Sequence, residues 1–145
     1  MANLMKLELL NRSENERVAR ICVSAFVATL DPTMEELTEI KTAVSEAVSN
    51  SIIHGYDQGQ EGKIFIECSV DQRNYVTIVV SDEGVGIEDV AQAREPLFTS
   101  KPTEERSGMG FTVMESFMDR LAVESDPGKG TKVTMVKILD KPYEL

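Results

Sequence analysis

The sequence has no long hydrophobic run, because its apolar residues come in short stretches interrupted by charged ones. A helix that spans a membrane needs roughly 18 or more consecutive apolar residues, so no transmembrane segment is predicted. The first residues do not resemble a secretory signal either, since Lys6, Glu8 and Asn11 interrupt their apolar pattern. We therefore expect a cytoplasmic protein without a membrane partner.

Cysteine is also scarce, with two residues in 145. Neither Cys22 nor Cys68 has the nearby cysteine or histidine that a zinc site or a redox pair requires. Each lies within an apolar pattern, so we expect two buried free thiols.

Basic residues are few relative to acidic ones, at 15 against 25, and the net charge is −10. Such a charge repels nucleic acid and anionic membranes and suits a basic protein partner. It is equally compatible with an acidic surface that binds nothing. We expect no direct contact with nucleic acid.

The two most common nucleotide-binding loops are absent. The segment that begins at Asp82 has glycines at 84 and 86, but a dinucleotide-binding fingerprint needs a third glycine where Asp89 stands. The phosphate-binding pattern G-x-x-x-x-G-K-[ST] does not occur anywhere in the chain. Any nucleotide site must be of another kind.

The N-terminal half predicts one strand and two helices. Residues 5–10 have β character, and capping boxes at Ser13 with Glu16 and at Thr33 with Glu36 predict two helix starts. The second helix is expected to end at Gly55. In the first helix, an apolar stripe should face the core and leave Arg17, Arg20 and Ser24 on the other side; the stripe comprises Val18, Ile21, Cys22, Ala25, Phe26 and Thr29.

The C-terminal half predicts a β-hairpin, a long loop, a helix and two more strands. Residues 64–70 and 76–80 alternate between apolar and polar around a turn at 71–74. Residues 88–110 lack an apolar period and are too many for an ordinary connector, which predicts a lid. A helix over 111–121 and strands over 122–125 and 131–138 follow. Residues 1–145 are thus expected to form a single domain, an α+β two-layer sandwich.

A row of polar residues marks the second helix. Glu46, Asn50 and His54 are spaced by four, which places a carboxylate, an amide and an imidazole on one helical face. A carboxylate can accept a proton, and an amide oxygen can ligate Mg²⁺. On spacing alone, an ordinary solvated helical face is the better interpretation of this row.

Three further segments contain paired glycines. Asp82 ends a strand and can accept a hydrogen bond from an adenine amino group, while Gly84 and Gly86 let the backbone approach a ligand, or simply form a turn. Ser107–Phe111 leads into a helix whose free N–H groups can face phosphate, and Lys101 and Arg106 add positive charge nearby. Gly128 to Thr131 read alone as a hairpin turn.

The order of these motifs resembles that of the GHKL ATPases. Glu-x-x-x-Asn on a helix, D-x-G-x-G after a strand, a lid, G-x-G before a helix and G-T before a strand follow in the same sequence. The segments SEAVSNSIIHGY, LFTSKP and ERSGMGFTVMESFMD resemble the anti-sigma factor serine kinases, in particular those that act on a sporulation sigma factor of the sigma F type. The resemblance spans nearly the whole chain. It implies a Bergerat fold, with a mixed, mostly antiparallel sheet and helices on one face.

The resemblance also implies roles for individual residues. Glu46 would be the catalytic base, Asn50 would ligate Mg²⁺, and Asp82 would bind the adenine amino group of ATP. The remaining implied nucleotide contacts are a glycine floor, a water-mediated adenine contact and a phosphate-binding segment, at Gly84, Gly86, Thr131, Ser107, Gly108, Met109, Gly110 and Phe111, with Lys101 and Arg106 from the lid. His54 has no implied role and reads as a structural histidine.

The activity implied by the resemblance is that of a homodimeric protein serine/threonine kinase. Such a protein binds and inhibits a sigma factor and uses Mg-ATP to phosphorylate a serine of an anti-anti-sigma factor. Arg17 and Arg20 are expected to contact a protein partner, since arginine is enriched at binding hot spots. The alternative is an ATP-gated interaction protein without phosphoryl transfer, and the carboxylate of Glu46 argues against it.

Overall fold

The computed structural model describes residues 2–57, 59–95 and 110–140. The elements follow the expected order of strand, helices, hairpin, helix and hairpin. They are β1 (Asn3–Leu10), α1 (Glu14–Val27), η1 (Ala28–Leu30), α2 (Met34–Asn50), η2 (Ser51–Gly55), β2 (Lys63–Val70), β3 (Tyr75–Asp82), α3 (Val90–Ala93), α4 (Gly110–Phe117), β4 (Arg120–Asp126) and β5 (Gly130–Ile138).

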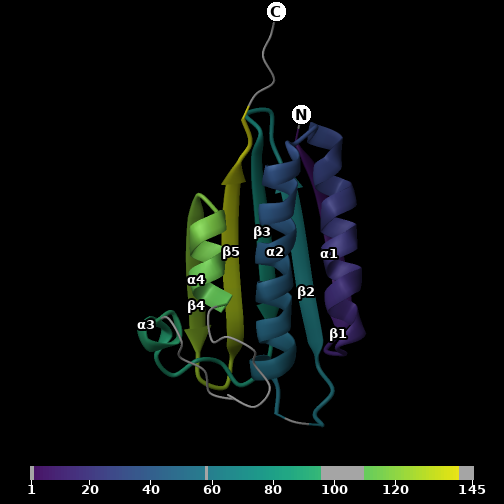
Figure 1. Ribbon diagram of the computed structural model, residues 1–145. Helices are drawn as coiled ribbons and strands as arrows, with labels where there is room; N and C mark the ends of the chain where they lie inside the picture. The colour runs from purple at the N-terminus through teal and green to yellow at the C-terminus, as the bar shows by residue number, and fades with distance from the viewer. Residues whose placement is uncertain (1, 58, 96–109, 141–145) are drawn as a thin grey trace, which may run out of the picture.

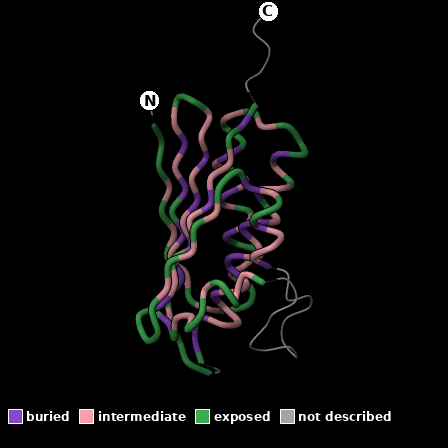
Figure 2. The backbone as a smooth tube through the Cα atoms, turned by 90° about the vertical axis from the view of Figure 1, so that its left-hand side faces the viewer, coloured by how far each residue is buried: buried purple, intermediate pink, exposed green. Residues whose placement is uncertain are grey.

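The strands form one five-stranded sheet in the order β1-β2-β3-β5-β4. Helices α1, α2 and α4 cover one face of it (Figure 1), and the view turned by 90° shows the two layers (Figure 2). This confirms the predicted α+β two-layer sandwich. The expected mixed sheet is corrected, because all four pairings among the described strands are antiparallel.

The core lies between the sheet and the helices. Strands β2 and β3 bury alternate residues, as their sequence pattern predicts, and α2 buries an apolar stripe opposite them. The largest fully buried side chains of these three elements are Ile40, Val44, Val48, Ile64, Ile66, Val76, Ile78 and Val80. Burial of each such side chain stabilises the fold by about 1.5–3 kcal/mol.

Helix α1 buries a different face from the predicted one. Its buried residues are Ala19, Val23 and Val27, whereas Val18 and Ile21 are 42% and 55% exposed. The apolar residues of this helix occupy most of its circumference, so their spacing does not select one face. Cys22 is likewise only partly buried, in contrast to the buried Cys68.

Of the two predicted capping boxes, one is confirmed and one is wrong. The Thr33 hydroxyl accepts a hydrogen bond from the Glu36 amide at 3.0 Å, and the Glu36 carboxylate accepts one from the Thr33 amide at 2.8 Å. Ser13 has helical backbone angles and makes no capping bond. Its expected partner, Glu16, instead accepts a hydrogen bond from the Ser45 hydroxyl of α2.

Two boundaries in the C-terminal half also differ from the prediction. Helix α4 ends at Phe117 rather than at 121, and Leu121 lies in β4 opposite Met135. The chain leaves the helix because the Asp119 amide donates to the Val136 carbonyl and the Asp119 carboxylate accepts from the Ile138 amide. Within residues 88–110, the short helix α3 was not predicted, and residues 96–109 lie outside the described part.

None of the helices in the described part of the chain is both long and apolar enough to cross a membrane.

Candidate functional site

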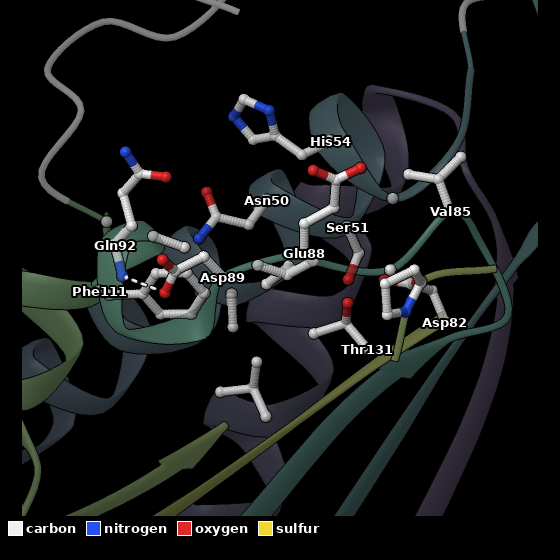
Figure 3. Close-up of a pocket in the computed structure, with 18 of the residues that line it drawn as sticks. Asn50, Ser51, His54, Asp82, Val85, Glu88, Asp89, Gln92, Phe111 and Thr131 are labelled. Carbon is white, nitrogen blue, oxygen red and sulfur yellow. Dashed lines mark hydrogen bonds between the residues drawn. The ribbon is translucent and has the colours of Figure 1, made fainter. Parts of the chain in front are cut away.

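A cavity of about 420 Å³ lies at the end of the sheet where α2 ends. It is lined by the end of α2, by η2, by the loop after β3, by α3, by the start of α4 and by the β4–β5 turn. Figure 3 shows Asp82 and Thr131 on one side of the cavity and Phe111, Asp89 and Gln92 on the other. Segments distant in the sequence therefore converge on one hollow between the two layers.

Glu46, Asn50 and Gly110 meet beside this cavity. A Cβ atom placed on Gly110 would lie 3.1 Å from the Asn50 amide nitrogen and 3.3 Å from a Glu46 carboxylate oxygen. Asn50 and Gly110 line the cavity, while Glu46 stands one helical turn earlier and is not part of its wall. The polar row on α2 thus faces the first turn of α4, and only glycine at position 110 leaves both side chains their room.

Asp82 is buried at the end of β3 and lines the cavity, with only 5% of its surface exposed. Its carboxylate accepts hydrogen bonds from the Gly84 amide at 3.0 Å, from the Ser51 side chain and from the Thr131 amide. Burial raises the pKa of this carboxyl, and the three hydrogen bonds partly oppose that shift. A buried carboxylate held by donors on one side is suited to accept a further hydrogen bond from a ligand.

Three glycines allow the backbone around Asp82 to pack closely. A Cβ at Gly84 would lie 1.6 Å from the Gly55 carbonyl oxygen, and one at Gly130 would lie 2.0 Å from that of Asp82. Gly86, with a φ of +75°, packs against the Asp126 carbonyl in the same way. Gly86 lines the cavity, whereas Gly84 lies behind its wall. Gly130, for which the sequence predicted only a hairpin turn, thus also packs closely against the backbone at Asp82.

Thr131 lies directly opposite Asp82 in the β3–β5 ladder. Its hydroxyl is 2.9 Å from that of Ser125, which also accepts a hydrogen bond from the Ile87 amide at 2.7 Å. The loop after β3 is therefore tied to the β4–β5 hairpin beside the cavity.

Apolar groups complete the wall. Ala47, Ile87, Phe111 and Val133 line the cavity together with the polar groups. A hollow with apolar sides and a few fixed hydrogen-bonding groups is typical of sites for small organic ligands. A flat heterocycle with an amino group fits both the walls and the carboxylate of Asp82.

Several lining residues were not predicted from the sequence. Ser51 begins η2, a π-helical turn, and π-helical turns occur frequently at functional sites. Glu88, Asp89 and Gln92 come from the segment predicted as a lid. No local sequence pattern marks Glu88, Asp89 and Gln92, because their positions depend on the path that the chain takes after β3. His54, which had no predicted role, also lines the cavity.

Some predicted site residues cannot be placed relative to this cavity. Lys101, Arg106, Ser107, Gly108 and Met109 lie outside the described residues. Arg17 and Arg20 lie on α1, away from the cavity, where the Arg20 guanidinium is 3.6 Å from the Glu16 carboxylate.

The described residues contain no cluster of three His, Cys, Asp or Glu side chains that could hold a metal ion. A Mg²⁺ ion carried by nucleotide phosphates needs few protein ligands, since it keeps its waters and its phosphate oxygens. The amide oxygen of Asn50 fits this limited role, because it lines the cavity beside the glycine that begins α4.

The comparisons with known proteins agree with this geometry. Residues 9–137 match the model of the histidine kinase-like ATPase domain. The anti-sigma F factor of Clostridium novyi (strain NT) is 58% identical over 137 residues, covering 94% of this chain and 95% of that protein. The anti-sigma F factor of Oceanobacillus iheyensis is 58% identical over 141 residues, covering 97% and 96%.

Solved structures resemble the fold at lower identity. The RsbU and RsbW domains of Rv1364c from Mycobacterium tuberculosis match with a TM-score of 0.72 at 18% identity, covering 99% of this chain and 34% of that one. The histidine kinase domain of the blue-light activated histidine kinase EL346 from Erythrobacter litoralis matches with a TM-score of 0.57 at 24% identity, covering 72% and 45%.

Proposed function

Because the chain belongs to the histidine kinase-like ATPase family and, within it, to the anti-sigma F factors, we propose that it is an ATP-dependent protein kinase that inhibits a sigma factor. Its proposed substrate is a serine of an anti-anti-sigma factor, and its proposed cofactors are ATP and Mg²⁺. The observation that carries the proposal is the convergence of Glu46, Asn50 and Gly110 beside a cavity that is lined by the buried Asp82.

In this proposal the adenine ring enters between Ala47, Ile87 and Val133, and its amino group donates to the Asp82 carboxylate. Thr131 and Ser51 border the same end of the cavity and can hold a water against the ring nitrogens. The two sides of the base are thus recognised differently, by apolar contact on its faces and by hydrogen bonds on its edge.

The triphosphate would then extend toward Asn50 and the start of α4. The positive end of the α4 helix dipole, on the Gly110 side of the helix, favours phosphate there. The described lining residues include four acidic side chains, Asp57, Asp82, Glu88 and Asp89. A triphosphate therefore needs cationic compensation in this cavity, and Mg²⁺, held by Asn50, would supply charge neutralisation when bound.

Glu46 is the proposed general base. The substrate serine oxygen attacks the γ-phosphorus, the bond to the β,γ-bridging oxygen breaks, and ADP leaves with that oxygen. The serine proton passes to the Glu46 carboxylate, which stands beside Gly110 where the γ-phosphate is expected. Phosphoryl transfer depends mostly on positioning and charge neutralisation, and Glu46 would add to these the acceptor for the hydroxyl proton.

The direct test supplies the purified protein with labelled ATP, Mg²⁺ and the anti-anti-sigma factor of the same organism. Label on one serine of that protein, lost when the serine is replaced by alanine, is the expected result. ATP-dependent binding of the sigma factor without any label on the anti-anti-sigma factor would favour an ATP-gated interaction protein instead.

The proposal includes a homodimer. Two observations on one side of the molecule support it: Val18 and Ile21 project from α1 with large exposed fractions, and β1 pairs with β2 but with no other described strand. Exposed apolar residues beside a free strand edge are suited to contact a second copy. Sedimentation should show that Ile21→Glu shifts the protein from dimer to monomer, and a dimeric variant would contradict this surface.

A further inference from the structure

Tyr56 is a buried tyrosine that lies behind the cavity wall. The residue is only 6% exposed, and it does not line the cavity. It directly follows η2, the π-helical turn that ends α2. Neither the proposed nucleotide contacts nor the proposed chemistry uses it.

The Tyr56 hydroxyl joins the ends of two strands. It donates to the Lys63 carbonyl at 2.6 Å and accepts from the Glu83 amide at 3.0 Å. The last pair of the β2–β3 ladder is Ile64 with Asp82, so Lys63 and Glu83 would form the next one. The hydroxyl therefore stands between two residues that would otherwise face each other, and it holds the loop after Asp82 at a fixed distance from β2.

The ring of Tyr56 has little freedom to move. A Cβ on Gly62 would lie 2.3 Å from the ring, so the Gly62 backbone lies directly against it. Gly62 is itself held by Asn11, whose side-chain oxygen accepts from the Gly62 amide at 2.9 Å and whose backbone N–H donates to the Gly62 carbonyl at 3.0 Å. The hydroxyl is thus presented from a rigid support.

Gly55 holds the same loop one residue earlier. Its carbonyl accepts a hydrogen bond from the Val85 amide at 2.6 Å. Two consecutive residues of one segment therefore bind the loop at Glu83 and at Val85. Between these two attachments lies Gly84, whose amide donates to the Asp82 carboxylate.

We propose that Tyr56 is a positioning residue for base recognition, whose hydroxyl fixes the Glu83–Val85 loop and through it the Asp82 carboxylate. This inference rests on the proposed function, because it assumes that Asp82 receives the adenine amino group. Loss of the hydroxyl leaves the Glu83 amide and the Lys63 carbonyl without their partner, and the loop then relaxes away from the geometry that orients Asp82.

The test compares Tyr56→Phe with wild type for binding of ATP and ITP, each with Mg²⁺. ITP carries a carbonyl oxygen in place of the adenine amino group, so the group that would face the Asp82 carboxylate is an acceptor and no longer donates a hydrogen bond to it. We expect Tyr56→Phe to weaken ATP binding by about five- to tenfold and to change ITP binding little. Tyr75→Phe, at the opposite end of β3, is the matched control and should leave both affinities unchanged.

A second variant displaces the Tyr56 side chain without changing Tyr56 itself. Gly62→Ala presses a methyl group against the Tyr56 ring without removing the hydroxyl, and it should lower the ratio of ATP to ITP affinity in the same direction. If Tyr56→Phe does not fold, the ratio of ATP to ITP affinity of Gly62→Ala tests the proposal.

Equal losses for ATP and ITP, or a lower melting temperature with an unchanged affinity ratio, would overturn the positioning role. Failure of the wild-type protein to prefer ATP over ITP would instead contradict the proposed function.

Discussion

At the scale of single residues, Asp82 combines a cost in folding with a gain in binding. Burial raises the pKa of its carboxyl above the ordinary value of 3.8. The folded protein therefore binds a proton at Asp82 more readily than the unfolded chain does. The contribution of this group to stability is present at low pH and is lost as pH rises through the raised pKa.

This linkage predicts opposite pH dependences for stability and for nucleotide binding. The unfolding free energy of nucleotide-free wild type, relative to that of Asp82→Asn, should fall as pH rises from the ordinary carboxyl pKa of 3.8 through the raised pKa of the folded state. ATP affinity of wild type should rise over the same window, because the adenine amino group requires the ionised carboxylate. Urea unfolding and ATP titration at several pH values measure both quantities. Parallel profiles in wild type and Asp82→Asn would show that Asp82 does not titrate in this way.

Gly110 permits a second prediction at this scale. The methyl group in Gly110→Ala must displace Asn50 or Glu46 by a few tenths of an ångström, since its distances to them are 3.1 and 3.3 Å. Phosphoryl transfer should slow by roughly ten- to a hundredfold, because small misplacements of catalytic groups are costly. Thermal stability should be unchanged or higher, since alanine favours helix.

Ser116 is an exposed residue of the same helix. Ser116→Ala is therefore the control for the effect of alanine on helix stability. A Gly110→Ala variant with the wild-type transfer rate would remove the proposed contact between α4 and the polar row of α2.

The residues of the site were only partly predictable. The sequence led to Asn50, Asp82, Phe111 and Thr131 because short motifs mark them, and all four line the cavity. Ser51 and Glu88 were missed, since the residue types carry no signal and their place depends on the π-helical turn and on the path of the loop. Tyr56 was missed because the partners of its hydroxyl, Lys63 and Glu83, lie seven and 27 residues further along the chain and meet it only in the folded structure.

At the scale of elements, local patterns predict where strands alternate better than how helices begin. The predicted β2–β3 hairpin is confirmed. It was predictable because burial of one face of a sheet requires apolar and polar residues to alternate along each strand. The two capping boxes look alike in sequence, yet only Thr33 has the extended backbone that lets its hydroxyl accept the Glu36 amide. Ser13 is already helical, and a tertiary contact with Ser45 occupies its expected partner Glu16.

This difference between the caps is measurable. Thr33→Ala should lower the free energy of unfolding by about 1 kcal/mol, the usual contribution of an N-cap. Ser13→Ala should change it by less than about 0.5 kcal/mol, as for a surface residue without a specific contact. Urea denaturation of both variants gives the comparison, and equal losses would mean that Ser13 does cap α1 in solution.

At the scale of the whole molecule, the cavity and the proposed partner surface on α1 are separate. Arg17 is exposed, and the Arg20 side chain is 37% exposed beside Glu16. An ion pair of this exposure contributes only about 0–1 kcal/mol to stability. Its removal should therefore leave the fold and the nucleotide site intact.

We expect Arg20→Ala to weaken binding of the sigma factor or of the anti-anti-sigma factor by roughly 30-fold or more, as for an interface hot spot. ATP affinity should stay at the wild-type value. The control is Arg12→Ala, which removes another arginine with an acidic neighbour, the exposed pair with Glu14. Undiminished binding of both proteins by Arg20→Ala would exclude Arg20 from their interfaces.

The central claim is that the converged groups of α2 and α4 transfer phosphate, and Glu46→Gln tests it most directly. The substitution keeps the shape of the side chain but cannot accept the serine proton. Single-turnover transfer from Mg-ATP to the anti-anti-sigma factor should slow by roughly 10²- to 10⁴-fold, the usual contribution of a general base. ATP affinity and sigma-factor binding, measured on the same preparation, should remain those of wild type. Transfer by Glu46→Gln at the wild-type rate would contradict the account.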